Sequence, residues 1–95
     1  MKEKILTQEI VEELGLNKVS VITADILEGY TGITSDAFVD CKSLISITIP
    51  DSVKSMGKSV FYGCSSLQSI IIPPGTKQKF ARFLPDSRDK LVEHI

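Results

Sequence analysis

The 95-residue chain is poor in long hydrophobic runs, in excess charge of either sign, and in histidine and cysteine. Its net charge of −1 provides no basic field that would gather nucleic acid or an anionic lipid surface. No stretch approaches the roughly 20 apolar residues of a membrane span. The opening segment MKEKILTQEIVEELG lacks the apolar run of a signal peptide, because Glu9, Glu12 and Glu13 interrupt it. We therefore expect neither a nucleic-acid partner nor insertion into a membrane.

The middle of the chain contains a repeat. Residues 37–50 read AFVDCKSLISITIP, and residues 60–73 read VFYGCSSLQSIIIP at an offset of 23 residues. Eight of the fourteen aligned pairs are identical. They are Phe38/Phe61, Cys41/Cys64, Ser43/Ser66, Leu44/Leu67, Ser46/Ser69, Ile47/Ile70, Ile49/Ile72 and Pro50/Pro73. A period in the twenties indicates a solenoid, in which each repeat buries its apolar side against its neighbours.

A fainter copy precedes these two at the same offset of 23 residues. A terminal repeat is expected to be atypical, because one of its faces has no neighbour of its own kind. We therefore predict three coils, of which the first is degenerate. The predicted alignment places Val21 under Leu44, Ile22 under Ile45, Ala24 under Ile47, Ile26 under Ile49, Glu28 under Asp51, Tyr30 under Val53 and Ile33 under Met56.

Each coil is predicted to be mostly strand and loop. In residues 44–49 isoleucine alternates with serine and threonine, and a period of two in β-branched residues is typical of a strand. Pro50 ends this strand, because proline cannot donate a hydrogen bond to a neighbouring strand. Val53 and Met56 indicate a second, very short strand or an extended turn.

A short amphipathic helix is predicted before the repeats. Thr7 serves as its N-cap, and Gly15 follows its last turn. A helix of about two turns is not stable alone, so we expect it to cover the open end of the first coil. The predicted helix spans residues 8–14, with Leu6 and Val11 as a hydrophobic staple and with Ile10, Val11 and Leu14 on its apolar side.

A second helix is predicted after the repeats. Thr76 is its expected N-cap, and Phe80, Phe83 and Leu84 share one face that would cover the last coil. Pro85 closes this helix. The tail that follows is either another short helix, capped by Asp86 or Ser87, or a strand through Lys90 to Glu93.

Cys41, Cys64 and His94 are the residues that could indicate a disulfide or a metal site. Neighbouring strands lie ~4.8 Å apart, which is wider than the ~3.8 Å between the Cβ atoms of a disulfide. A zinc site needs four ligands, and these three residues do not supply them. We predict that the cysteines are buried, reduced thiols and that His94 belongs to a solvated tail. No catalytic constellation, metal site or cofactor site is expected.

These residues resemble the BspA-like leucine-rich repeats of bacterial and protist proteins. The family pattern runs approximately A-F-x-x-C-x-x-L-x-x-I-x-I-P-x-x-V-x-x-I-G, and this chain reads AFVDCKSLISITIPDSVKSMG, with Met56 in place of isoleucine. The second copy departs from the pattern at Val60, where alanine is usual. The closing segment IPPGTKQKFARFLPDSRDKLVE resembles the terminal cap of such proteins. The resemblance covers about residues 20–95 and implies a right-handed, β-rich solenoid used for binding, often on a cell surface.

The predicted fold class is mainly β with short helices. We expect a right-handed leucine-rich-repeat solenoid of about three 23-residue coils in one domain spanning residues 1–95. Residues 1–16 form the N-terminal helical cap, residues 17–73 the repeats and residues 74–95 the C-terminal cap.

Alternation along the strands indicates which side chains face outward. A rigid sheet surface of this kind suits protein recognition, although a plain solvated face has the same pattern. The candidate interaction face consists of Thr23, Asp25, Ser46, Thr48, Ser69 and Ile71, flanked by Ile22, Ile45 and Gln68.

Together these patterns predict a non-enzymatic protein-interaction module with an unknown protein partner. The alternative is a structural or self-associating terminal fragment of a longer adhesin-type protein. We expect a monomer or weak self-association, because the N-terminal segment is acidic and the C-terminal segment is basic. A complete protein would be cytoplasmic, whereas a fragment of a longer family member would be secreted or lie at the cell surface.

Overall fold

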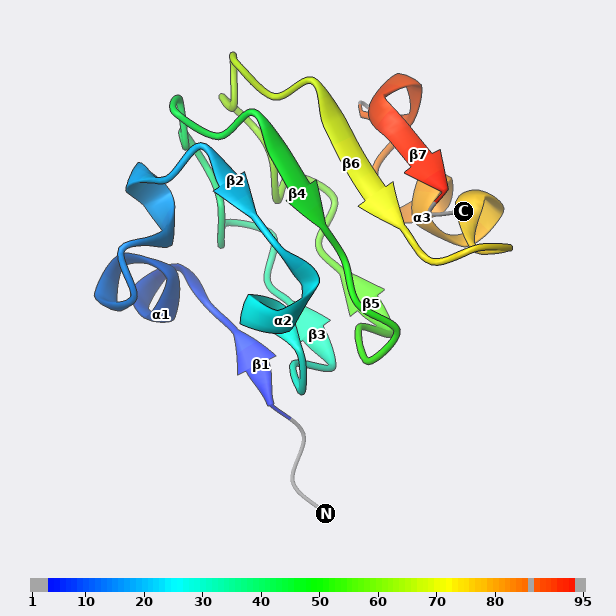
Figure 1. The fold of residues 1–95 in the computed structure, drawn as a ribbon, viewed down its shortest axis with the longest axis horizontal. Helices are drawn as coiled ribbons and strands as arrows, with labels where there is room; N and C mark the ends of the chain where they lie inside the picture. The colour runs from blue at the N-terminus through cyan, green and yellow to red at the C-terminus, as the bar shows by residue number, and fades with distance from the viewer. Residues whose placement is uncertain (1–3, 86, 94–95) are drawn as a thin grey trace.

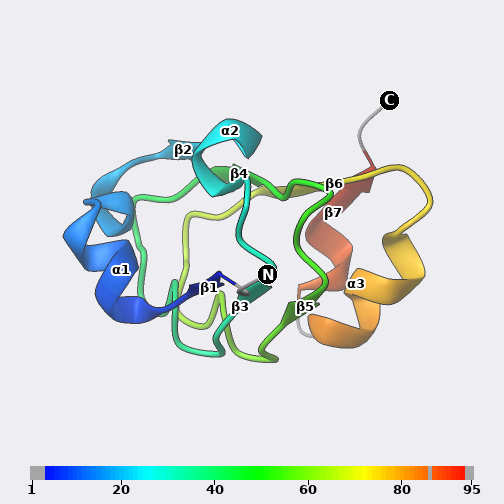
Figure 2. The ribbon, with the colours of Figure 1, turned by 90° about the horizontal axis from the view of Figure 1, so that it is seen from below.

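The computed structural model describes residues 4–85 and 87–93 and consists of two layers of parallel strands (Figures 1 and 2). One layer is a four-stranded sheet in the order β2-β4-β6-β7, and the other is a three-stranded sheet in the order β1-β3-β5. The strands of the first sheet are β2 (Val21–Ile22), β4 (Ser46–Thr48), β6 (Ser69–Ile72) and β7 (Leu91–Glu93). Those of the second are β1 (Ile5–Leu6), β3 (Gly32–Ile33) and β5 (Ser55–Met56).

The predicted offset of 23 residues is confirmed in the centre of both sheets. Ser46 lies opposite Ser69 in the first sheet, and Gly32 lies opposite Ser55 in the second. The second short strand predicted around Met56 is present as β5. Ile47 of β4 and Ile70 and Ile72 of β6 point into the core, because alternate side chains of a strand face opposite sides of the sheet.

The predicted register of the first coil is wrong. Ile22 pairs with Ile47, an offset of 25 residues, instead of lying under Ile45. Val21 likewise pairs with Ser46 and not with Leu44, and Ala24 and Ile26 lie in a helix instead of under Ile47 and Ile49.

A short helix, α2 (Ala24–Leu27), causes this shift. Ile22 and Ile33 are 11 positions apart, whereas the equivalent residues of the next coil, Ile47 and Met56, are 9 apart, so the first coil has two additional residues. The offset returns to 23 after α2, because Ile33 pairs with Met56 as predicted. Leu27, fully buried, anchors α2 to the core.

The predicted N-terminal helix is present as α1 (Gln8–Glu13). The hydroxyl of Thr7 accepts a hydrogen bond from the backbone nitrogen of Ile10 at 3.3 Å, which is the expected N-cap. Gly15, at φ 74°, adopts the left-handed conformation that follows many helices. Leu14 does not share the apolar side, since it is the C-cap residue and is 55% exposed. A 3₁₀ turn, η1 (Leu16–Lys18), follows α1.

The N-terminal segment also contributes a strand that the sequence pattern did not predict. Ile5 and Leu6 form β1, which pairs with β3 at Gly32 and Ile33. Leu6 and Val11 are fully buried, consistent with the predicted staple. The segment therefore belongs to the second sheet as well as covering the end of the core, where Figure 2 shows α1.

The C-terminal segment contains α3 (Lys77–Phe83) at the opposite end of the two layers (Figure 2). Phe80 and Leu84 are buried, and the rings of Phe80 and Phe83 meet edge to face at a centroid distance of 5.9 Å. Thr76 is not the predicted side-chain cap, because its hydroxyl donates to the carbonyl oxygen of Pro73 at 2.5 Å instead of accepting from the helix.

Both alternatives for the tail occur one after the other. A 3₁₀ turn, η2 (Arg88–Lys90), precedes β7, and β7 pairs with β6 from Ile70 opposite Leu91 to Ile72 opposite Glu93. The first sheet therefore gains a fourth strand from the predicted C-terminal cap. The predicted capping residue Asp86 lies outside the described residues.

A candidate interaction face and an adjoining groove

The centre of the predicted face is formed by β4 and β6. Ser46 and Ser69 lie opposite each other, and their hydroxyl oxygens are 3.2 Å apart. Thr48 lies opposite Ile71 in the same register. All four side chains are half-buried, because each stands between neighbouring strands and solvent. These four residues form the continuous row that the alternation predicted.

Two of the three flanking residues of the predicted face, Ile45 and Gln68, precede the strands. Ile45 and Gln68 are exposed, and the backbone nitrogen of Gln68 donates to the carbonyl oxygen of Ile45 at 2.8 Å. Val92 of β7 extends the row, since it pairs with Ile71 and is 49% exposed. Alternation within Leu91–Glu93 could have found Val92 if the tail had been identified as a strand.

The first coil does not contribute to this row as predicted. Thr23 is the N-cap residue of α2, and Asp25 lies in the first turn of that helix. Both are exposed, and the hydroxyl of Thr23 donates to a carboxylate oxygen of Asp25. Ile22, expected at the flank, is fully buried because it points into the core opposite Ile47. The flanking position predicted for Ile22 is therefore wrong, whereas Thr23 and Asp25 are exposed as predicted but lie at the start of α2 instead of on a strand.

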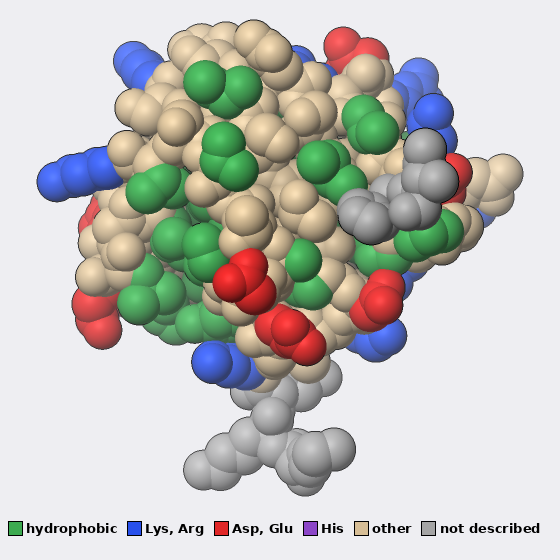
Figure 3. Space-filling view, in the orientation of Figure 1, with side chains coloured by type: hydrophobic (Ala, Val, Ile, Leu, Met, Phe, Trp, Pro, Cys, Tyr) green, Lys and Arg blue, Asp and Glu red, His purple; other side chains and the backbone are tan. Residues whose placement is uncertain are grey.

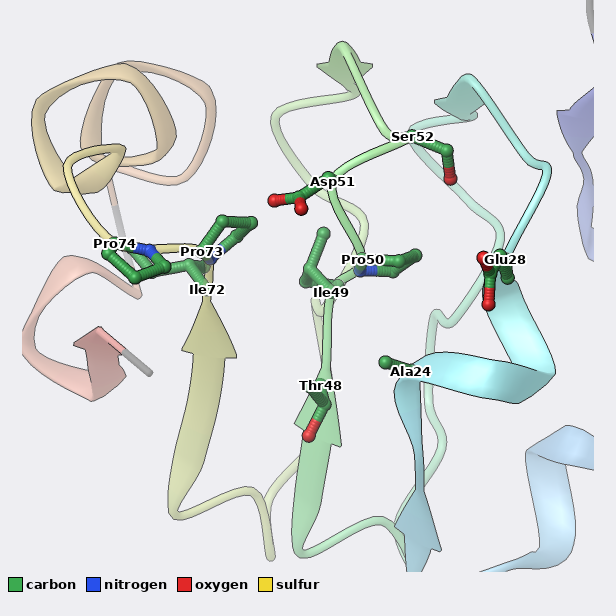
Figure 4. A pocket seen from close by; sticks show the side chains of 10 residues that line it. All are labelled: Ala24, Glu28, Thr48, Ile49, Pro50, Asp51, Ser52, Ile72, Pro73 and Pro74. Atoms are coloured by element: carbon green, nitrogen blue, oxygen red, sulfur yellow. The ribbon is translucent and has the colours of Figure 1, made fainter. Parts of the chain in front are cut away.

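The inserted helix borders a groove at the carboxyl ends of β4 and β6 (Figure 4). The groove has a volume of about 350 Å³. Buried Ile49 and Ile72 line its floor, and polar side chains lie at its edge. Figure 4 shows the methyl group of Ala24 pointing from α2 toward β4. The residues that line the groove are Ala24, Glu28, Thr48, Ile49, Pro50, Asp51, Ser52, Ile72, Pro73 and Pro74.

Hydrogen bonds hold the turns that form the groove. The backbone nitrogen of Gly29 donates to the hydroxyl of Ser52 at 3.2 Å, joining the end of α2 to the turn after β4. The Lys54 ammonium donates to the carbonyl oxygen of Asp51 at 3.2 Å. Figure 3 shows acidic side chains gathered on this part of the face, with hydrophobic side chains distributed over the rest. The groove therefore combines an apolar floor with an acidic edge.

Of the groove residues, sequence reasoning included Thr48 in the candidate face and missed the others as a site. The signal that could have found the groove is the two-residue excess between Ile22 and Ile33. That excess is invisible in an alignment without gaps, because at the offset of 23 residues Ile22 and Ile26 both fall on isoleucines.

The cysteines are buried free thiols, as predicted. The thiol of Cys64 donates to the carbonyl oxygen of Phe38 at 2.9 Å. Burial, together with the neighbouring Cys64, raises the pKa of Cys41 to about 11, and burial also raises the pKa of Cys64. Because the thiolate is the reactive form, both side chains are poor nucleophiles near neutral pH.

Within residues 4–85 and 87–93, no group of three histidine, cysteine or acidic side chains could hold a metal ion. None of the helices formed by these residues is long and apolar enough to cross a membrane. The prediction for His94 falls outside the described part of the chain.

The fold can be compared with known families. A family profile described as "BspA type leucine rich repeat region (6 copies)" matches residues 9–83, from α1 to the last residue of α3. The chain belongs to this family. This confirms the resemblance that the repeated pattern indicates. Comparison with curated proteins gave no match, and comparison with solved structures gave none either. BspA-type leucine-rich repeats generally mediate protein binding and are generally non-enzymatic.

Proposed function

We propose that this chain is a non-enzymatic protein-interaction module. In this proposal the molecule is a right-handed solenoid of about three 23-residue coils, and its paired parallel strands belong to successive coils. The domain boundaries, with residues 1–16 and 74–95 as caps, stay a prediction. The partner is a protein and not nucleic acid, since the net charge of −1 offers no general attraction for phosphate.

The proposed binding surface is the outward row on the four-stranded sheet. The observation that supports this proposal is the register of β4 with β6, in which Ser46 lies opposite Ser69 and Thr48 lies opposite Ile71. This register holds small hydroxyl and aliphatic side chains on one rigid surface. Exposed Ile45 lies beside this row, and the exposed residues Thr23 and Asp25 lie at the start of α2. Rigid strands lose little conformational entropy when they bind, which favours recognition by such a surface.

Capture from native surroundings tests this proposal. We expect Ile71→Lys to reduce recovery of the partner at least tenfold, because it places a charge in the centre of the row. The matched control is Leu14→Lys, which makes the same kind of change directly after α1, at a side chain that is 55% exposed. A partner identified by mass spectrometry should disappear with the first variant and persist with the second. Equal recovery by both variants would show that the row is not the binding surface.

A second candidate is self-association of a structural terminal fragment of a longer surface protein. The observation that favours it is the position of acidic α1 and basic α3 at opposite ends of the molecule (Figure 2).

A further inference from the structure

The groove beside α2 holds two carboxylates at equivalent positions of neighbouring turns. Glu28 ends α2, and Asp51 stands 23 residues later, the same offset as between β3 and β5. The hydrogen bond from Gly29 to Ser52, at 3.2 Å, joins the residues directly after them. Both carboxylates are exposed at the edge of the groove, where they attract positive charge.

The negative charge of these carboxylates is not offset by an ion pair within residues 4–85 and 87–93. Lys54 lies close by, but its ammonium donates to the carbonyl oxygen of Asp51 and not to the carboxylate. Figure 4 shows the side chains of Glu28 and Asp51 on either side of Pro50. A positive charge placed at this edge would interact favourably with both carboxylates.

The walls of the groove suit the stem of a long side chain. The rings of Pro50 and Pro73 and the methyl group of Ala24 are apolar. Proline also has no backbone N–H that could donate a hydrogen bond to an acceptor group of a ligand. Lysine and arginine pack their methylene stems on apolar surface and keep the charged group at the polar edge. A volume of about 350 Å³ accommodates such a side chain with part of the adjoining backbone.

A metal ion does not fit this groove as well. Within residues 4–85 and 87–93 no group of three histidine, cysteine or acidic side chains could hold a metal ion, and the acidic side chains that line the groove are Glu28 and Asp51.

We propose that this groove binds a lysine or arginine side chain on an extended segment of the partner protein. This inference rests on the proposed function, because it names the chemistry of the protein that the module would recognise. It also places the site at the edge of the outward row. Thr48 belongs to both the groove and the row, so one partner segment could contact both surfaces there.

Titration of the isotope-labelled protein with a short peptide tests the groove directly. The probe is acetyl-Ala-Ala-Arg-Ala-Ala-amide, and its twin carries norleucine in place of arginine. We expect the arginine peptide to shift the amide resonances of Ala24, Glu28 and Ser52 in nuclear magnetic resonance spectra. The norleucine peptide should shift them much less at equal concentration, because it has no charge for the carboxylates.

Charge removal provides the decisive comparison. Glu28→Gln with Asp51→Asn should raise the Kd of the arginine peptide by roughly three- to tenfold, the range for two exposed ion pairs. The control, Glu12→Gln with Glu13→Gln, removes the same charge from exposed positions of α1 and should change the Kd by less than about twofold.

Equal loss of affinity in both double variants would overturn the proposal, because it would reveal attraction by net charge alone. Equal binding of the norleucine peptide would also overturn it. Neither result affects capture through the outward row, which is tested separately with Ile71→Lys. Equal capture by Ile71→Lys and Leu14→Lys, with an intact peptide titration, would instead contradict the proposed binding surface and leave the groove as a site for a cationic side chain.

Discussion

At the residue scale, stacked phenylalanine rings join the two best-matched repeats. The rings of Phe38 and Phe61 are 5.8 Å apart between centroids and inclined by 17°. Phe38 is fully buried and Phe61 is 5% exposed. Because these residues occupy equivalent positions 23 residues apart, their stacking repeats the strand register within the core.

Phe61→Ala should lower the free energy of unfolding by about 3 to 5 kcal/mol, since it removes a ring that contacts both repeats and leaves a cavity. Denaturant melts followed by circular dichroism measure this loss. Tyr62→Ala is the matched control, because that adjacent ring is 71% exposed, and it should cost less than about 0.5 kcal/mol. A loss below about 1 kcal/mol for Phe61→Ala would contradict its role in the core.

Residue placement could be predicted where a residue has a counterpart 23 positions away. Cys41 and Cys64 are an example, because two equivalent small apolar positions predict burial in both copies. Leu14 is the opposite case. Its spacing on the helix indicates the apolar side, but the helix ends before it and the chain turns at Gly15, so the side chain faces solvent.

At the scale of elements, the N-terminal helix depends on its cap. Thr7→Ala should destabilise the protein by about 1 kcal/mol, because it removes the hydroxyl that accepts from Ile10. Thermal and denaturant melts measure the change. Thr23→Ala is the matched control, since Thr23 is also an N-cap residue but makes no side-chain cap hydrogen bond. Equal losses in the two variants would show that the Thr7 cap does not stabilise α1.

The elements themselves differ in how well the sequence predicts them. Strands β4 and β6 are predicted because isoleucine and polar side chains alternate over several residues and then recur. Strand β1 has two residues, too few to establish a period, and only its pairing with Gly32 and Ile33 defines it. Helix α2 is hidden because the apolar residues of its segment also fit a strand. The groove, which α2 borders, was unpredictable for the same reason.

At the scale of the whole molecule, opposite charges lie at opposite ends. Helix α1 carries Glu9, Glu12 and Glu13, whereas α3 carries Lys77, Lys79 and Arg82. Figure 2 shows these helices at the two ends of the layers. This arrangement permits the end of one molecule to attract the other end of the next.

Sedimentation velocity should therefore show weak, concentration-dependent association at low salt. The association should disappear near 1 M salt, where the screening length falls to about 3 Å. Glu12→Lys with Glu13→Lys should abolish it at low salt, because the acidic end becomes basic. Wild-type protein that sediments as a monomer at high concentration and low salt would rule out this association.

The order of the strands also has a consequence for how the chain folds. In every strand pair, at least one other helix or strand lies between the two strands in the sequence. The first pair joins Ile5 to Gly32, which is 27 positions away. No strand can therefore form a hairpin with its neighbour in sequence, and loop closure must precede each pairing. During synthesis from the N-terminus, β1 must wait for β3, β2 for β4, and β6 for β7. The first sheet is therefore complete only after β7 (Leu91–Glu93) has emerged.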